Sequence, residues 1–176
     1  VVLNDCLMNN LISVENTAIF TFDVDSSVIR NTNETFMYAL HFDALGFFSS
    51  RLATFSYNIF TNCNAISMNI GMTLLGCNIR CLSSCFYNFT SDDPDVGIFH
   101  SEIPINIIFA ANSLFFDIKA KYVFLARSVL SVNVRNCSFS SSRENVYLVE
   151  ENKLNENDNE YLVEPKVISF SESNIK

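Results

Sequence analysis

A loosely repeated pattern of apolar residues constrains the fold of this chain more than any other feature. In "VLSVNVRNCSFSSS" (129–142), apolar and polar residues alternate and then give way to an asparagine, a cysteine and a run of serines. Written as apolar, any, apolar, any, any, small polar, any, apolar, the pattern starts at residues 1, 53, 72, 107, 132 and 168, with a defective copy at 29. Self-similarity at such intervals is typical of solenoids, in which each turn buries its apolar face against its neighbours.

The pattern predicts an all-β chain folded as a right-handed parallel β-helix of roughly seven coils. Inward-facing residues of successive coils stack in columns in such a fold, and a small polar residue at a corner can hydrogen-bond along its column. Only four glycines are present, which is sparse for the hairpins of the alternative fold, a β-sandwich or jelly roll. The predicted corner column is Cys6, Asn58, Cys77, Asn112, Cys137 and Ser173.

Strand signals cover most of the chain. Residues rich in β-branched and aromatic side chains, many of them alternating with polar ones, occupy 17–24, 51–60, 65–75, 105–110, 129–134 and 166–173. The segment 114–129 alternates in part but also shows helical spacing, so we interpret it as strand with a short helix as the alternative. We treat residues 1–176 as a single solenoid segment of a longer chain.

One polar segment interrupts the strand pattern. From Arg143 to Lys166 the chain is acidic, and the tetrapeptide Tyr-Leu-Val-Glu at 147–150 recurs at 161–164. We interpret the two copies as short strands on either side of an exposed acidic loop, 151–160.

Composition excludes several classes of protein. Hydrophobic residues make up 49% of the 176 positions, with 17 phenylalanines, which excludes disorder for most of the chain. The net charge is −8 and no basic cluster is present, so nucleic acid is not expected as a partner. No apolar run reaches the ~18–20 residues of a membrane helix, so no membrane span is predicted. The partners expected are proteins in a larger assembly, or neighbouring coils of the same chain.

Sequons and cysteines favour an extracellular or cell-surface location. Asn33 and Asn88 begin sequons for N-glycosylation, as does Asn136. Six cysteines could form three disulfides. The candidates are Cys77, Cys81 and Cys85, bonded among themselves or to Cys63, with free buried thiols as the first alternative and a structural metal as the last.

No group of residues indicates catalysis, and no catalytic residue, cofactor or metal ligand is assigned. His41 and His100 are isolated, and no Gly-x-Ser-x-Gly elbow accompanies the many serines. Asp92, Asp93 and Asp95 cluster in "SDDPD", a possible calcium or partner loop.

Three stretches resemble the coil segments of pectin-lyase-like β-helix proteins: "VVLNDCLMNN", "SVIRNTNETF" and "SVNVRNCSFSSS". They are most similar to the repeats of polymorphic outer membrane proteins and of protist surface proteins. The Gly-Gly-Ala-Ile repeat of that family is absent, and only "LMNN" at 7–10 echoes its Phe-x-x-Asn repeat. The resemblance implies a right-handed β-helix.

The function expected from this reading is that of a non-enzymatic structural or adhesive module in a surface or extracellular assembly. A carbohydrate-active lyase or hydrolase on the same fold is one alternative, with the aspartates of 91–95 as its site. An intracellular filament or cytoskeletal scaffold component is the other, and it predicts reduced cysteines and bare sequons.

Overall fold

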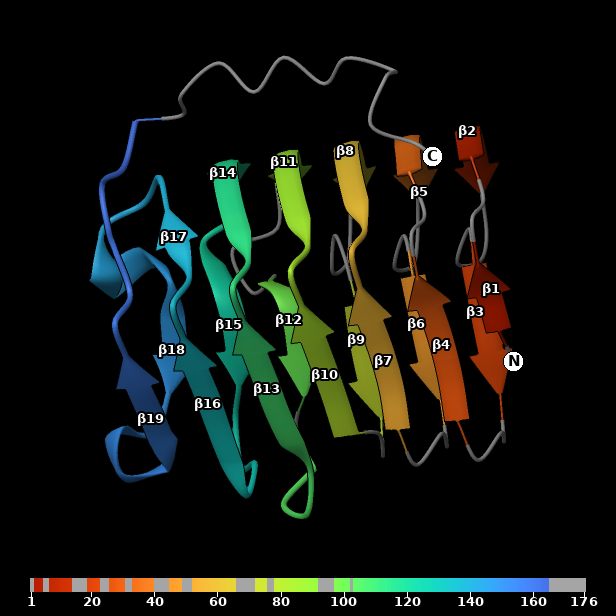
Figure 1. Ribbon diagram of the computed structural model, residues 1–176. Helices are drawn as coiled ribbons and strands as arrows, with labels where there is room; N and C mark the ends of the chain where they lie inside the picture. The colour runs from red at the N-terminus through yellow and green to blue at the C-terminus, as the bar shows by residue number, and fades with distance from the viewer. Residues whose placement is uncertain are drawn as a thin grey trace.

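The computed structural model is built almost entirely of parallel strands (Figure 1). It describes the backbone of residues 2–4, 7–13, 19–22, 26–30, 33–39, 45–48, 52–65, 72–75, 78–91, 97–101 and 103–164. Side chains are described chiefly for 52–62, 78–91, 97–101, 103–150 and 152–164.

The strands form three parallel sheets, here named A, B and C. Sheet A has the order β1 (Val2–Asn4), β4 (Ser26–Arg30), β7 (Leu52–Ser56), β10 (Asn78–Leu82), β13 (Ile107–Ala111), β16 (Ser131–Arg135) and β19 (Leu154–Asn157). Sheet B has the order β2 (Leu7–Ser13), β5 (Asn33–Ala39), β8 (Ile59–Ala65), β11 (Cys85–Ser91), β14 (Leu114–Lys119) and β17 (Ser138–Phe139). Sheet C has the order β3 (Ile19–Phe22), β6 (Leu45–Phe48), β9 (Met72–Leu75), β12 (Gly97–Ser101), β15 (Tyr122–Ala126) and β18 (Tyr147–Val149).

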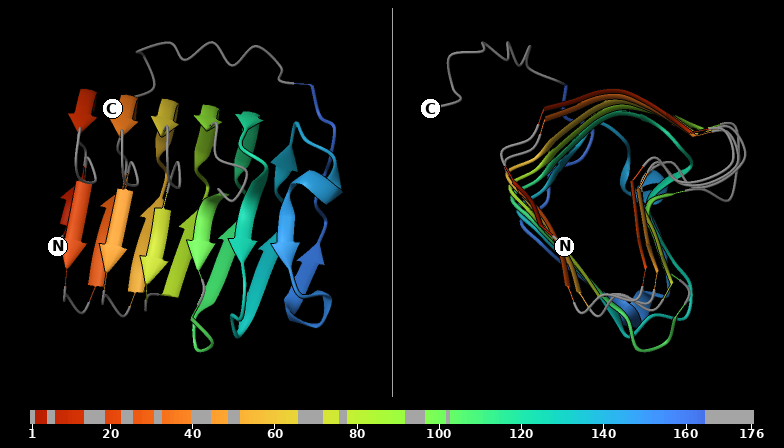
Figure 2. Two further views of the ribbon diagram at one scale, coloured as in Figure 1. Left: turned by 180° about the vertical axis from the view of Figure 1, so that it is seen from behind. Right: turned by 90° about the vertical axis from the view of Figure 1, so that its right-hand side faces the viewer.

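Consecutive strands belong to different sheets, and each strand pairs with the strands three places before and after it. The chain therefore winds through sheets A, B and C in turn, and the view along the axis shows successive coils stacked over one another (Figure 2). This is a β-solenoid, as the repeated pattern predicts. The alternative of a β-sandwich or jelly roll is wrong, because those folds pair their strands antiparallel through hairpins and every pairing described here is parallel.

The ambiguous segment 114–129 is strand, since it contains β14 and β15. Helix is confined in the described chain to two short 3₁₀ turns, η1 (Arg143–Asn145) and η2 (Glu151–Lys153).

The acidic segment is more ordered than the expected loop. Residues 151–160 contain η2 and then β19, which pairs with β16 so that Leu154 lies beside Val132. Of the two Tyr-Leu-Val-Glu copies, the first forms β18 over its first three residues, whereas the second is not a strand. Leu154 supplies an apolar residue at the inward position, where it packs against the core as sheet A continues through an otherwise polar sequence.

The core lies inside the three sheets and is dominated by phenylalanine. Side chains along β10 alternate between buried Ile79 and Cys81 and more exposed neighbours, as one-sided burial requires. The largest fully buried side chains of the described residues are Phe55, Phe60, Phe86, Phe89, Phe99, Phe115, Phe124 and Phe139.

The apolar pattern describes the passage from sheet A to sheet B. Its copies at 53 and 132 match the buried positions, and strand register places Leu3 and Met8 of the first copy level with Phe55 and Phe60. The copy at 107 is wrong by one residue, because Ile108 rather than Ile107 is buried. The copy at 72 is also wrong, because Met72 lies in sheet C. The copy at 168 lies outside the described residues.

Candidate functional site

The corner between sheets A and B is made by the same backbone conformation in the five coils from β7 to β19. The residue after each of these five strands of sheet A has a positive φ, between 47° and 58°, which reverses the side-chain alternation so that the following residue points inward. These left-handed residues are Tyr57, Ser83, Asn112, Asn136 and Asp158. The residues that follow them are Asn58, Ser84, Ser113, Cys137 and Asn159, and we name this set the corner column.

Hydrogen bonds run along the corner column from coil to coil. The backbone N–H of Asn58 donates to Ser84 Oγ at 3.2 Å, and that of Ser84 donates to Ser113 Oγ at 3.2 Å. The N–H of Cys137 donates to Asn159 Oδ1 at 3.0 Å. Ser113 Oγ also donates to the carbonyl of Ala111 at 2.9 Å. Each polar side chain therefore satisfies a backbone donor of the preceding coil that the corner would otherwise leave buried and unpaired.

The predicted corner column is confirmed at Asn58 and Cys137 and is wrong at Asn112. Asn112 occupies the left-handed position, and its neighbour Ser113 is the buried member. The side chain of Asn112 faces outward, where its Oδ1 accepts a hydrogen bond from Asn136 Nδ2 at 2.8 Å. Cys6, Cys77 and Ser173 lie outside the described residues.

Two ladders of stacked aromatic rings fill the interior. Centroids of adjacent rings in each ladder lie 4.9–5.5 Å apart with nearly parallel planes, and rings of one ladder meet those of the other edge to face. Both arrangements favour the quadrupoles of the rings. The sheet B ladder is Phe60, Phe86, Phe115, Phe139 and Tyr161, and the sheet C ladder is Phe99, Phe124 and Tyr147.

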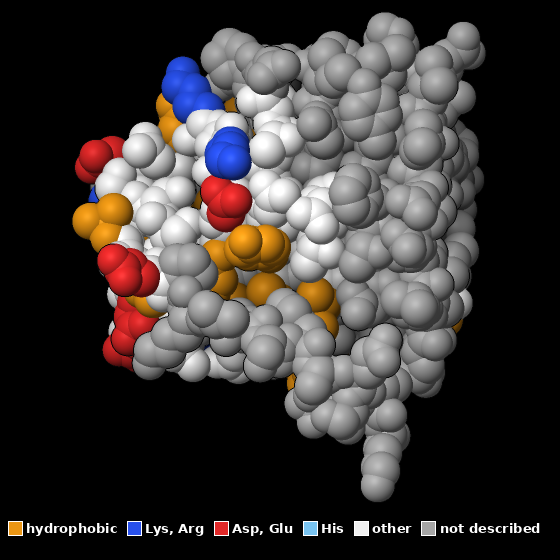
Figure 3. Space-filling view, turned by 90° about the horizontal axis from the view of Figure 1, so that it is seen from above, with side chains coloured by type: hydrophobic (Ala, Val, Ile, Leu, Met, Phe, Trp, Pro, Cys, Tyr) orange, Lys and Arg blue, Asp and Glu red, His pale blue; other side chains and the backbone are white. Residues whose placement is uncertain are grey.

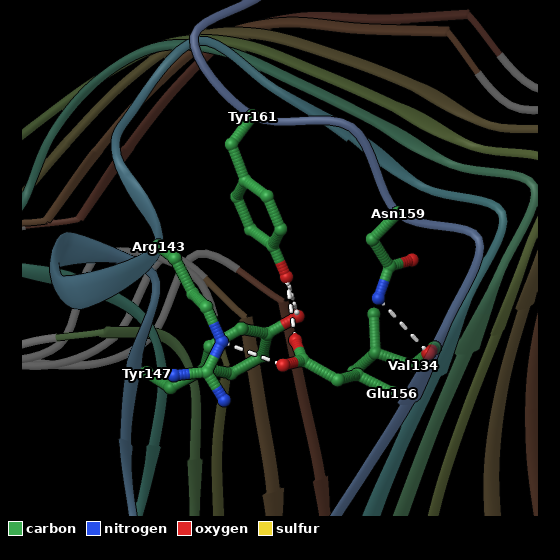
Figure 4. Close-up of polar contacts among 6 residues, drawn as sticks. All are labelled: Val134, Arg143, Tyr147, Glu156, Asn159 and Tyr161. Carbon is green, nitrogen blue, oxygen red and sulfur yellow. Dashed lines mark hydrogen bonds and ion pairs between the residues drawn. The ribbon is translucent and has the colours of Figure 1, made fainter.

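Both ladders end in tyrosines that join a polar network at the C-terminal end of the described chain (Figure 4). The hydroxyls of Tyr147 and Tyr161 lie 3.1 Å apart, and Tyr161 Oη donates to Glu156 Oε2 at 2.6 Å. Arg143 Nε donates to the other carboxylate oxygen, and its guanidinium lies 5.9 Å from the centre of the Tyr147 ring. We name these four residues the terminal network.

The surroundings of the two phenols keep them protonated. Burial is the main cause that raises the pKa of Tyr147, and the hydrogen bond with Tyr161 adds to it. Burial also raises the pKa of Tyr161 to about 12, with a further contribution from its hydrogen bond to Glu156. Because Tyr161 donates to the carboxylate, the shared hydrogen bond between the phenols is donated by Tyr147.

The terminal network holds the last described coil together, and it directs the Glu156 carboxylate towards protein groups rather than towards an outside substrate. Both oxygens of this carboxylate are engaged, one by a guanidinium and one by a phenol. Nearby, Asn159 Nδ2 donates to the carbonyl of Val134 at 3.1 Å and ties the final corner to β16 (Figure 4). A general acid or base needs a free proton site facing a substrate, so this geometry suits a structural role.

The expected disulfides are not formed by the cysteines whose side chains are described. Cys81, Cys85 and Cys137 are free buried thiols. Cys81 points into the core, 3.6 Å from Ser113 Oγ, whereas Cys85 alternates with inward Phe86 and faces the other side of the wall, so the two cannot pair. Burial raises the pKa of Cys81 to about 12 and those of Cys85 and Cys137 to about 11. The side chains of Cys63 and Cys77 lie outside the described residues.

The sequon asparagine Asn88 takes part in a second column. It adopts a left-handed conformation within β11, as Asn62 does within β8, and its Nδ2 donates to Asn62 Oδ1 at 2.6 Å. Because a glycan is attached through this nitrogen, glycosylation of Asn88 would have to precede folding or break the hydrogen bond. Asn33 lies in β5, and its side chain lies outside the described residues.

The possible calcium or partner loop lies outside the described part of the chain. Asp92, Asp93 and Asp95 lie outside the described residues, and His100 lies in sheet C. Among the described residues, no three His, Cys, Asp or Glu side chains could share a metal ion. The described part of the chain also contains no helix long and apolar enough to cross a membrane.

The outer surface carries small apolar groups set among polar and charged ones. Figure 3 shows one face, on which hydrophobic side chains lie beside acidic and basic ones. The exposed large apolar side chains of the described residues come from separate elements: Val2 in β1, Leu52 in β7, Tyr57 at a corner, Tyr87 in β11, Ile105 before β13, Leu130 before β16 and Leu162 near the end. On sheet A, the guanidinium of Arg135 lies 5.1 Å from the centre of the Phe109 ring.

Sequence reasoning missed the terminal network, although the repeated Tyr-Leu-Val-Glu was a usable signal, because its two copies supply the tyrosines that end the two ladders. Comparisons with protein-family models, curated proteins and solved structures find no match to this chain. Its function must therefore be inferred from the geometry of the solenoid itself.

Proposed function

We propose that this chain is a non-enzymatic structural β-solenoid module, part of an assembly at a cell surface or outside the cell. Its contribution is geometric: a stiff body whose loops present contacts to protein partners or to further coils. We propose further that the solenoid is a right-handed β-helix of roughly seven coils, similar to those of pectin-lyase-like β-helix proteins.

The observation that carries the proposal is the continuity of the axial columns. Phe115 stacks on Phe86 and on Phe139. Ser113 Oγ accepts a hydrogen bond from the backbone N–H of Ser84 across the first of these two coil boundaries. Adjacent coils are thus joined by backbone ladders, by stacked rings and by corner hydrogen bonds at once. Bending would strain all three together, because tightly packed interiors respond to deformation as a unit.

Intact mass measurement tests the proposed location. The native protein is weighed before and after glycosidase treatment, and its thiols are alkylated in denaturant without reductant. The expected result is sugar on Asn33 or Asn88. We also expect disulfides, and hence no alkylation, at some of the cysteines other than Cys81, Cys85 and Cys137. Bare asparagines and six alkylated thiols would contradict a secretory location.

Small-angle X-ray scattering of the natural full-length protein tests the proposed rigidity. A stack of coils predicts an elongated particle whose cross-section stays constant when the temperature is raised towards the unfolding transition. A gradual increase in the cross-section at temperatures well below that transition would contradict a stiff module.

A second candidate, an intracellular scaffold component, is favoured by the state of the thiols. Cys81, Cys85 and Cys137 are all free, as is usual for proteins in a reducing compartment. The same mass measurement separates the two candidates, since the scaffold predicts six free thiols and no sugar.

A further inference from the structure

Two phenol side chains contact each other in the terminal network. No other pair of described tyrosines shares a hydrogen bond between its hydroxyls. Tyr147 and Tyr161 have hydroxyls 3.1 Å apart, ring centroids 6.5 Å apart and planes inclined by 74°. Each ortho carbon is two bonds from a hydroxyl oxygen, so the contact between the hydroxyls places the reacting ends of the two rings next to each other. Glu156 accepts the hydrogen bond of Tyr161 at 2.6 Å, which gives the pair a proton acceptor in direct contact.

We propose that Tyr147 and Tyr161 are a site of oxidative cross-linking, at which a one-electron oxidant converts the pair into an intrachain dityrosine. The product would join Tyr147, at the end of the sheet C ladder, covalently to Tyr161, at the end of the sheet B ladder. The loop it closes runs from β18 through η2 and β19, and so encloses the last strand of sheet A.

The reaction balances as a loss of two electrons and two protons. The first oxidation takes an electron from Tyr161 while its phenolic proton moves to Glu156. The second takes an electron from Tyr147, whose proton leaves through the oxygen to which it is hydrogen-bonded. One carbon–carbon bond then forms between the ortho positions, and the two ring hydrogens move to the phenolic oxygens as aromaticity returns. The electrons reduce the oxidant, and the protons reach solvent by way of Glu156.

The neutral state of the phenols makes the carboxylate important. With a pKa of about 12, Tyr161 carries almost no phenolate at neutral pH, so its oxidation must be accompanied by loss of the proton. A bound carboxylate lowers the cost of that step, because the proton leaves with the electron and the charged radical cation is never formed at this partly buried phenol. Tyr57 and Tyr87 are more exposed and therefore easier to reach, but neither has a phenol as a hydrogen-bond partner in the described structure.

The test exposes the full chain to persulfate and a light-activated ruthenium tris-bipyridyl complex, which together act as a one-electron oxidant. Persulfate is reduced to two sulfates for each cross-link formed. The expected product is a monomer lighter by two hydrogens, with dityrosine fluorescence and a cross-linked peptide that joins residues 147 and 161. Tyr161→Phe should abolish this product, whereas Tyr57→Phe, a matched change at an exposed site, should leave its yield unchanged.

Glu156→Gln tests the proton acceptor separately. The glutamine carbonyl can still accept the hydrogen bond of Tyr161 but is a far weaker base, so the rate of cross-linking should fall several-fold while the peptide link stays the same. An unchanged rate would overturn the role of Glu156. A free tyrosine ester oxidised in the same tube shows that the oxidant is active. If that ester reacts and the protein forms only links between chains, or none, the proposed site is wrong.

Discussion

Phe115 and Tyr161 occupy the same aromatic ladder two coils apart, and their surroundings differ sharply. Phe115 is fully buried between stacked rings on both sides and meets Phe99 and Phe124 edge to face. Among the described residues Tyr161 stacks on one side only, and its hydroxyl belongs to a network with a carboxylate and a guanidinium. The same column of rings thus lies in an apolar interior at Phe115 and in a polar network at Tyr161. The surroundings of an inward-facing ring therefore depend on the position of its coil in the stack.

Truncation of the interior ring should have the largest effect. Phe115→Ala removes a ring that touches four others, so we expect a loss of about 3–5 kcal/mol in the free energy of unfolding. Urea titration followed by circular dichroism measures it. Tyr161→Ala, the same truncation at the end of the ladder, should cost clearly less. Equal losses would break the distinction between interior and end.

High pH should weaken the interior through its thiols. The pKa of Cys81 is raised from 9.0 to about 12 in the folded chain, so between these values the unfolded state releases a proton that the folded state retains. Stability is therefore fully present below pH 9 and falls as the pH rises towards 12, by up to about 1.4 kcal/mol per pH unit for one thiol. Urea unfolding at several pH values checks this. Cys81→Ser, which cannot ionise in this range, should show a shallower decline, and an identical slope would contradict the assignment.

Loss of a corner hydrogen bond should have an intermediate effect. Ser113→Ala leaves the buried N–H of Ser84 without its acceptor, and we expect a cost of about 1–3 kcal/mol. Ser138→Ala makes the same chemical change at a more exposed hydroxyl whose contact with Glu160 is long, 3.5 Å, and should change stability by less than about 0.5 kcal/mol. Thermal unfolding of the two variants compares them, and a reversed order would rule out the corner column as a source of stability.

The smallest effect is expected in the terminal network. Arg143→Ala removes an ion pair with Glu156 in which both side chains are partly exposed, 47% and 27%, so solvent screening should limit the loss to about 0–1 kcal/mol. Added salt should reduce the difference from the parent chain further. Urea titration at low and high salt measures both effects, and a loss as large as that of Ser113→Ala would show that the end is as tightly packed as the interior.

The solenoid and part of its corner could be predicted from the sequence because inward positions repeat. Asn58 and Cys137 were identified as corner residues from the spacing of apolar residues around them, and the backbone reversal explains that spacing. The register of other coils could not be found in this way. Ser84 follows a coil whose pattern contains Cys81 where an apolar residue was expected, and Ser113 was hidden by Asn112, an equally small polar neighbour.

The repeated Tyr-Leu-Val-Glu points to the two tyrosines of the terminal network, but nothing in the sequence indicates their contacts. Arg143, Tyr147, Glu156 and Tyr161 are brought together only by the winding of the last coil, and β19 was hidden within a stretch whose composition favours a loop. Pairing with a preformed neighbour such as β16 stabilises a strand that its own residues would not specify.

The coils differ in length, and this difference is confined to places away from the corner. Equivalent corner residues are 26, 29, 24 and 22 positions apart, yet the backbone reversal recurs unchanged. Five residues separate β11 from β12, whereas two separate β14 from β15. Foreign peptides inserted between sheets B and C should therefore be displayed in a row, at intervals set by the strand spacing of about 4.8 Å, while the columns inside keep their register.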